Sequence, residues 1–190
     1  AASAVDWVSS VCGFASPAEL YAKAAQRDKP SGSEIFLPYL SGERTPHNDA
    51  EIRGSFVGLS HNSDQQTLTQ AVVEGVAFAI RDNLAALETA GTQLTRMTAV
   101  GGGARSVYWL KALATILNIP IDVPADGDFG GAFGAARLAM IAANDADPMA
   151  VCTAPVTETT IEPEQNLSGA YNEAYGEYRR LYPLLKSTSE

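Results

Sequence analysis

The sequence has few cysteines and no long apolar run, and each shortage excludes a class of protein. Its 190 residues contain two cysteines, Cys12 and Cys152, which lie far apart and at no spacing used by metal ligands. A scaffold built on disulfides is therefore excluded, and a pair of reduced thiols in a cytoplasmic protein is predicted. No apolar run reaches the roughly 20 residues that a membrane-spanning helix needs, so we expect no membrane partner.

Basic residues are also scarce. There are 13 of them against 22 acidic residues, which gives a formal net charge of −9 at pH 7. This charge repels nucleic acids and anionic membranes, so neither is expected as a partner. A ligand that carries phosphate must be held locally, by backbone amides, a helix end or a metal ion. Neither His47 nor His61 has a cysteine or carboxylate at metal-ligand spacing, so no metal site is predicted in the chain itself.

The length suits one domain with its own core, and no change of composition divides it. Apolar residues at helical or strand spacing predict the elements. Helices are predicted at 1–14, 16–25, 63–90, 107–117 and 131–143, with a last helix that carries Tyr171, Tyr175, Tyr178 and Tyr182, and strands at 35–40, 54–59, 97–100 and 119–123. The order strand, helix, strand, helix from 97 to 143 predicts parallel strands with helices packed on the sheet, which is an α/β fold.

Local signals predict three helix ends. Ser16 followed by Pro17 is typical of an N-cap and a first helical residue. Ser63, with Gln66 three residues later, predicts a capping box at the start of the long helix. Gly91 predicts the end of that helix. These signals predict three helix boundaries before any packing is considered.

The segment from Val100 to Ser106, VGGGARS, lies between a predicted strand and a predicted helix. Glycines let a ligand approach the backbone, and the free N–H groups of a helix start favour phosphate and polar ring edges, so this is a candidate nucleotide loop. No Gly-Lys-Ser/Thr follows, which excludes a Walker-type loop, and Ser106 stands where a dinucleotide fingerprint needs its last glycine. Taken alone, the segment fits a ligand loop or a tight strand-to-helix turn equally well.

Five segments in a fixed order carry a resemblance to a known family. They are FLPYLSGERTPH at 36–47, GSFVGL at 54–59, AVVEG at 71–75, VGGGARS at 100–106 and GAFGAARL at 131–138. Together they resemble the C-terminal domain of the FGGY carbohydrate kinases, closely from 36 to 143 and loosely in the flanks. Among the members, the sequence is most similar to the kinases of the pentulose xylulose.

The resemblance implies an actin-like ATPase fold, related to ribonuclease H, in which two domains close on a cleft. An N-terminal domain would hold most of the sugar, and residues 1–190 most of the ATP with its Mg²⁺. In the family the catalytic base is an aspartate of the N-terminal part, followed by a Gly-Thr-Ser-Gly turn, and neither feature occurs in this sequence. We therefore expect a C-terminal fragment without its sugar-binding domain and first strands, with no catalytic residue, and inactive alone.

The resemblance also assigns roles within the glycine loop. Gly102, Gly103 and Ala104 are expected to form the surface against which adenine and ribose pack, while Ser106 caps the helix or contacts the ligand. Trp109 follows three residues later. It is favoured as a core residue over an adenine wall, because a tryptophan contributes a large buried area.

Four other features favour a structural role over a functional one. Glu74, on the apolar side of the long helix, is expected to be buried with an arginine or a backbone group as its partner. Glu43 and Arg44 are expected to lock their loop by an ion pair rather than contact substrate. The small residues at 130–136 predict close packing of their helix, and the tyrosines at 171–182 predict a stripe docked on the core.

Two alternatives stay open. Ribulose, gluconate, rhamnulose and glycerol kinases share the scaffold, and the choice of sugar lies chiefly in the N-terminal domain. A lone actin-like half could instead be a binding module without catalysis that forms a homodimer through an exposed sheet edge and its cleft face. A nucleotide titration and a measured solution mass distinguish these alternatives.

Overall fold

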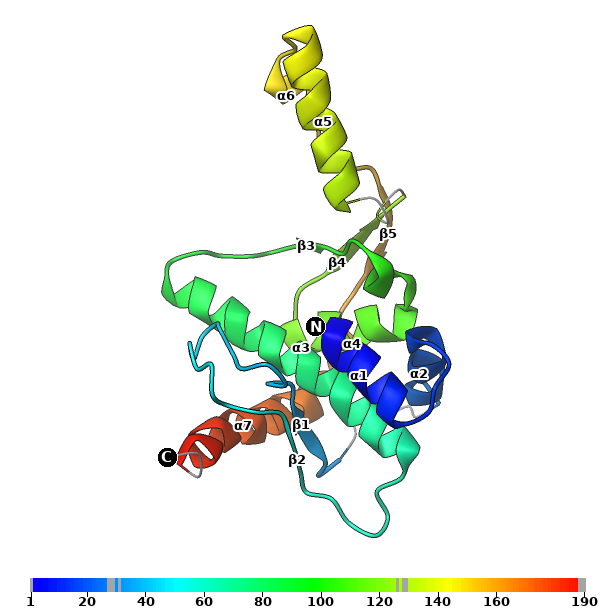
Figure 1. The fold of residues 1–190 in the computed structure, drawn as a ribbon, viewed down its shortest axis with the longest axis vertical. Coiled ribbons are helices and arrows are strands. Elements are labelled where there is room, and N and C mark those ends of the chain that lie inside the picture. The colour runs from blue at the N-terminus through cyan, green and yellow to red at the C-terminus, as the bar shows by residue number, and fades with distance from the viewer. Residues whose placement is uncertain (1, 27–29, 31, 126, 128–129, 188–190) are drawn as a thin grey trace.

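The computed structural model describes residues 2–26, 30, 32–125, 127 and 130–187, which form a mixed α/β fold (Figure 1). Its elements are α1 (Ala2–Val11), α2 (Pro17–Ala24), β1 (Ile35–Leu37), β2 (Ser55–Val57), α3 (Gln65–Thr89), β3 (Met97–Thr98), the 3-10 turn η1 (Gly102–Arg105), α4 (Val107–Leu117), β4 (Ile121–Pro124), α5 (Gly130–Asn144), α6 (Pro148–Val151), β5 (Thr157–Ile161) and α7 (Gln165–Ser187). None of the helices in this described part is both long and apolar enough to cross a membrane.

The larger sheet has the strand order β3-β4-β5 and confirms the predicted parallel pair. Met97 of β3 lies opposite Ile121 of β4 in parallel register. Strand β5 was not predicted, because its residues, TETTI, are exposed or half-buried and show no apolar alternation. It runs antiparallel to β4. Polar side chains support it, since Asp122 Oδ1 accepts hydrogen bonds of 2.6 Å from both Thr160 Oγ1 and Arg96 Nη1.

Helix α3 lies at the centre of the core and packs against α1, α2, α4 and β1 (Figure 1). Its apolar face includes Val72, Val73 and Val76, each 2% exposed or less. Gly75 lies on the backbone of β1: a Cβ added there would stand 2.1 Å from the carbonyl oxygen of Phe36. The absence of a side chain at this position therefore lets the helix contact the strand directly.

Two of the three predicted helix-end signals are confirmed. Ser16 is the N-cap of α2, with Pro17 as the first helical residue, and its hydroxyl accepts the N–H of Glu19 at 3.3 Å. Gly91 follows the last residues of α3 with a φ of +92°, a conformation that glycine adopts without strain. Both signals act through the backbone of their own turn, which is why the sequence alone reveals them.

The predicted capping box at Ser63 is wrong. The N-cap of α3 is Asp64, whose carboxylate oxygen Oδ1 accepts the N–H of Thr67 at 2.8 Å. The hydroxyl of Ser63 instead donates to Glu34 Oε1 at 2.7 Å, across 29 positions of sequence. Serine and aspartate cap helices about equally well, so the tertiary contact of Ser63 decides which of the two neighbours serves.

Helices α5 and α6 project from the sheet, away from α3 and α4 (Figure 1). No residue of α5 is buried, and a Cβ at Gly131 or Gly134 would meet no described atom within 4 Å. The close helix packing predicted for 130–136 is therefore wrong, as is the expectation that this helix covers the sheet. Three large apolar side chains of α5 are exposed, Phe133 by 48%, Leu138 by 67% and Met140 by 54%.

The tyrosine stripe on α7 is confirmed. Tyr171, Tyr175 and Tyr178 are 4%, 9% and 0% exposed, and they pack against the core of the domain. The Tyr178 hydroxyl donates to the Tyr39 hydroxyl at 3.0 Å. Each buried ring thus contributes apolar area while its polar tip finds a partner, which is the usual requirement for burying tyrosine.

Candidate functional site

The glycine segment continues from β3 as a single 3-10 turn that leads into α4. Gly101 has a φ of +84°, residues 102–105 form η1, and Ser106 caps α4 by accepting the N–H of Trp109 at 3.2 Å. The N–H of Gly101 donates to the carbonyl oxygen of Gly127 at 2.9 Å, which fixes the start of the loop. The capping role predicted for Ser106 is confirmed.

The backbone conformation requires glycine at one of the three glycine positions of this loop but not at the other two. Gly101 adopts the left-handed region, which other residues rarely enter. Gly102 and Gly103 have no positive φ. A Cβ at Gly102 would meet no described atom within 4 Å, and one at Gly103 would meet the indole of Trp109 at 3.5 Å, an ordinary contact. A tight turn therefore accounts for Gly101 alone, while Gly102 and Gly103 leave a bare backbone open to a ligand.

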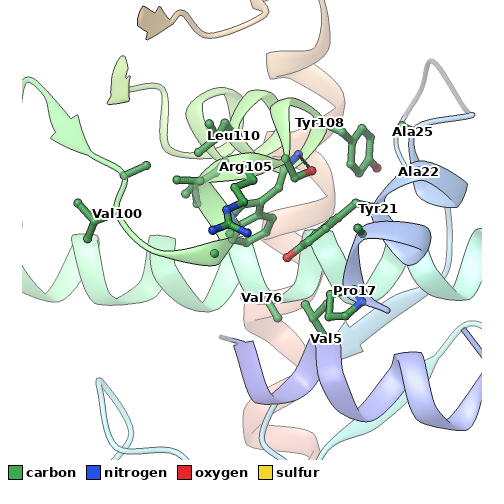
Figure 2. A pocket seen from close by; sticks show the side chains of 18 of the residues that line it. Val5, Pro17, Tyr21, Ala22, Ala25, Val76, Val100, Arg105, Tyr108 and Leu110 are labelled. Carbon is green, nitrogen blue, oxygen red and sulfur yellow. Dashed lines mark hydrogen bonds between the residues drawn. The ribbon is translucent and has the colours of Figure 1, made fainter. Parts of the chain in front are cut away.

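A cavity of about 870 Å³ opens beside this loop, between α2 and α3 on one side and η1 and α4 on the other (Figure 2). The four residues predicted as nucleotide contacts line it together: Gly102, Gly103, Ala104 and Ser106. Apolar side chains form much of the remaining wall, among them Pro17, Val76 and Leu110. The volume lies within the range of small-molecule sites, and the lining suits a flat, apolar ring.

Tyr21 and Arg105 reach into this space from opposite walls (Figure 2). The ring of Tyr21 lies 6.4 Å from that of Trp109, centroid to centroid. Burial and the nearby carboxylate of Asp6 raise the pKa of Tyr21, so its hydroxyl stays protonated and can donate at neutral pH. Arg105 and Asp6 are the two charged side chains among the described residues of the lining. The cavity thus combines aromatic walls with a cation that can face phosphate.

The sequence indicates the loop, but it does not indicate that the side chains of Tyr21 and Arg105 line the same cavity. Tyr21 belongs to α2, far from the loop in sequence, and only the packing of α2 on α3 and α4 brings it to the cavity. Arg105 lies within the glycine segment itself, and its position between Ala104 and Ser106 is a sequence signal for a cation at this site. Trp109 is 8% exposed, as predicted for a core residue, yet it also lines the cavity. A core position for Trp109 is therefore compatible with a place in the wall of the cavity.

Glu74 is buried as predicted, and an amide and a phenol are among its partners. The carboxylate is 1% exposed, and its Oε1 accepts a hydrogen bond of 3.1 Å from the amide of Gln70. It also bonds the hydroxyl of Tyr171, whose pKa is raised mainly by burial and further by this carboxylate. An arginine or backbone group as a further partner stays a prediction. Glu74 is not among the described residues that line the cavity.

The loop at 41–49 is locked, although not by the expected Glu43–Arg44 ion pair. Glu43 and Asp49 exchange two backbone hydrogen bonds of 2.7 Å, and Glu43 Oε1 accepts the N–H of Thr45 at 3.1 Å. Burial raises the pKa of Glu43 against the effect of these N–H groups. The hydroxyl of Tyr182 donates to Asp49 Oδ2 at 3.0 Å and ties the loop to α7.

Within the residues that the structure describes, no cluster of three histidine, cysteine or acidic side chains could hold a metal ion. Both cysteines are free, as predicted: Cys12 is half-buried and Cys152 is exposed. Burial raises the pKa of the Cys12 thiol, which favours its protonated form.

Comparison with known proteins defines the class. Residues 1–143, three-quarters of the chain, match the model of the FGGY family of carbohydrate kinases, C-terminal domain. The chain therefore belongs to this family, and the resemblance carried by its five sequence segments is confirmed. The glycine loop and its cavity lie within the matched residues.

Particular relatives are named as xylulose kinases. The chain is 40% identical over 187 residues to the xylulose kinase of Escherichia coli K12, a match that covers 97% of this chain and 38% of that protein. It is 43% identical over 145 residues to the xylulose kinase of Klebsiella pneumoniae, covering 76% of this chain and 30% of the relative. The chain thus spans less than two fifths of the length of these relatives.

Solved structures agree. A structure described as a xyloylose kinase from Brucella ovis superposes with a TM-score of 0.90 at 61% identity, over 99% of this chain and 39% of that one. The xylulose kinase of Lactobacillus acidophilus gives a TM-score of 0.84 at 27% identity, over 98% and 38%. The predicted actin-like ATPase fold of the FGGY sugar kinases is therefore confirmed.

Proposed function

We propose that this chain is the nucleotide-side domain of a longer, cytoplasmic carbohydrate kinase, and that Gly102, Gly103, Ala104 and Ser106 contact its ATP. The observation that carries the proposal is the bare backbone at Gly102 and Gly103, which faces an apolar cavity and has no conformational or packing reason within the described residues. A nucleotide base and ribose explain both glycines, because they need close approach to the loop. Exposed Arg105 can face the phosphates.

The proposed reaction transfers the γ-phosphoryl group of ATP to a hydroxyl of D-xylulose, giving D-xylulose 5-phosphate and ADP. Support comes from the relatives named as xylulose kinases at 40% and 43% identity. Mg²⁺ would arrive with the nucleotide, since phosphate oxygens supply most of its ligands in such sites. The hydroxyl proton needs a carboxylate base, which we place in the N-terminal domain, so the chain alone should bind nucleotide without turning over sugar.

Nucleotide binding is tested by titrating ADP into this chain by calorimetry. Gly102→Leu and Gly103→Leu add side chains at the cavity wall where the backbone tolerates them, and each should weaken ADP binding by about tenfold or more. Gly176→Leu is the matched control, because Gly176 also has open space around it but lies on α7, away from the cavity. Equal ADP affinity in all three variants would contradict the assignment.

The sugar is tested with the complete polypeptide, by following ADP release with D-xylulose against ribulose, gluconate, rhamnulose and glycerol. A gluconokinase of Bacillus subtilis is 34% identical to this chain over 133 residues, so gluconate is the most informative alternative substrate. Preference for xylulose supports the reaction as proposed. Preference for another sugar keeps the nucleotide site and changes the substrate.

A homodimer is the second possibility that the structure favours, because the large apolar side chains of α5 are exposed. Such a patch is typical of an interaction surface. The solution mass of the chain tests it, and Leu138→Glu should return a dimer to the monomeric mass. A monomeric mass at all concentrations excludes pairing through α5.

A further inference from the structure

Trp109 occupies a position that packing alone does not explain. It is the third residue of α4 and is 8% exposed, with its ring against Tyr21. Its indole nitrogen Nε1 lies toward the glycine loop: it would stand 3.5 Å from a Cβ placed on Gly103. Both residues line the cavity of about 870 Å³. The polar edge of the indole is therefore at the surface where a ligand would meet the bare backbone.

The indole N–H has no acceptor among the described residues. The backbone N–H of Trp109 donates to Ser106 Oγ, but the side chain makes no hydrogen bond to the described part of the chain. Nε1 is not one of the fully enclosed polar atoms, so part of its surface is open, and Trp109 lines the cavity. A buried tryptophan N–H usually finds an acceptor, because leaving it unpaired is unfavourable. Phenylalanine would place a smaller aromatic ring here without a donor that needs an acceptor.

The chemistry of the missing partner follows from the donor and its surroundings. An indole N–H can only donate, so the ligand must present an acceptor. The neighbouring walls, which include Val76, Leu110 and the ring of Tyr21, favour a flat ring over a charged or hydroxyl-rich group. Purine rings carry acceptor nitrogens within a flat aromatic frame. A ring nitrogen of a purine meets both conditions.

We infer that the indole N–H of Trp109 donates to a ring nitrogen of the adenine base and is a specificity-determining contact of this pocket. The inference rests on the nucleotide binding proposed above and adds to it a named donor. It also gives Trp109 a role that a packing residue would not have, because the contact depends on one hydrogen and not on ring volume.

The direct test changes the ligand and leaves the protein intact. The affinities of ADP, 1-deaza-ADP, 3-deaza-ADP and 7-deaza-ADP are measured by calorimetry; each analogue replaces one ring nitrogen by C–H. One analogue should bind about 5- to 30-fold more weakly than ADP, which corresponds to the loss of one partly buried hydrogen bond. Analogues that all bind like ADP would overturn the inference.

The second test changes the protein. Trp109→Phe keeps an aromatic ring and removes the N–H, and it should weaken ADP binding by the same factor as the sensitive analogue. Trp109→Phe should not weaken the binding of that analogue any further, because the analogue already lacks the acceptor for the indole N–H. Trp7→Phe is the matched control: Trp7 stacks on Phe36 at 6.0 Å and does not line the cavity.

The outcomes separate this inference from the proposed function. If ADP does not bind the unsubstituted chain, both are overturned. If ADP binds and Trp109→Phe, folded as judged by circular dichroism, binds ADP and every analogue as the unsubstituted chain does, the nucleotide site stands and the role of Trp109 is rejected. If Trp109→Phe does not fold, the deaza analogues on the unsubstituted chain decide.

Discussion

Asp82 of α3 is approached by polar side chains from α7 and from the loop at 41–49. It is 6% exposed, and its Oδ1 accepts the hydroxyl of Tyr175 at 2.6 Å. His47 Nε2 and Arg179 Nε lie 3.9 and 3.8 Å from its two oxygens. Desolvation and the bond to Asp82 raise the pKa of Tyr175, so the phenol remains the donor at neutral pH. A buried carboxylate of this kind depends on its short hydrogen bond.

Tyr175→Phe should therefore destabilise the domain by about 1.5–3 kcal/mol, the range for a hydrogen bond to a charged group. The ring itself keeps its contact with Phe78, so lost packing does not account for the effect. Urea denaturation measures the change. Tyr182→Phe removes a hydroxyl bound to Asp49, which is half-buried and so better solvated than Asp82, and should show a smaller loss. Equal losses would contradict the special role of the Asp82 bond.

The imidazole of His47 makes stability depend on pH. Its ring stacks on Tyr182 at 3.5 Å, and its Nε2 is buried without a hydrogen-bond partner in the described residues. Burial lowers the pKa of His47, and the carboxylates of Asp82 and Asp49 offset this only in part. The folded protein thus resists protonation more than the unfolded chain does. Stability is complete above the unfolded pKa of about 6.5 and falls as the pH drops through that value.

Between pH 7.5 and pH 6.0, the free energy of unfolding should fall more for the unsubstituted chain than for His47→Gln. Urea denaturation at both values measures the difference, in a window above the titration of ordinary carboxylates. His61→Gln is the control, because His61 is exposed and is the other of the two histidines. A pH response that disappears in His61→Gln and persists in His47→Gln would refute the assignment.

The backbones of helix α3 and strand β1 lie in direct contact at Gly75, because this residue has no side chain. Gly75→Ala would place a Cβ 2.1 Å from the Phe36 carbonyl oxygen, which no rotamer change can relieve because the obstacle is backbone. The expected loss is about 3 kcal/mol, at the upper end for overpacked cores. Gly176→Ala, in α7 with open space around it, should instead stabilise by about 0.5–1 kcal/mol through helix propensity.

Thermal or urea unfolding of the two alanine variants tests this pair directly. The same substitution in two helices should change stability in opposite directions. A mild or absent effect of Gly75→Ala would mean that α3 and β1 lie further apart than described.

The domain as a whole divides into a packed body and a projecting arm formed by α5 and α6 (Figure 1). Helices α3 and α4 contribute many buried residues, whereas α5 contributes none. Elements with few buried contacts unfold locally at low free energy, so their amide hydrogens exchange readily with solvent. Amide hydrogens of the core exchange only when the whole domain unfolds. In this 190-residue chain, the amides of α5 should exchange about 100-fold faster than those of α4, or faster still.

Hydrogen exchange followed by mass spectrometry measures this contrast, with α7 as an internal reference for a terminal helix that is docked. Equal protection of α5 and α4 would show that α5 is covered in solution, by a second copy or by another part of the molecule. A dependence of α5 protection on protein concentration would distinguish the second copy.

How far the sequence predicts each element depends on how local its signal is. The helix predicted at 107–117 has those bounds in the structure, because a serine cap and a run of apolar residues define it within its own turns. Strand β5 was missed, because an edge strand with polar faces lacks the alternation that identifies strands. The cap of α3 was assigned one residue too early, since a contact of Ser63 with Glu34 lies outside any local pattern.

In the candidate site, too, some features follow from short sequence segments and others only from tertiary packing. The sequence by itself determined the glycine loop, its capping serine and the family, because these depend on backbone requirements and residue order within short segments. Only the tertiary structure decided that Tyr21 faces Arg105 and Trp109 across one cavity, and that α5 is left uncovered. These depend on which distant surfaces pack together, a balance of many small contacts that no short segment of sequence contains.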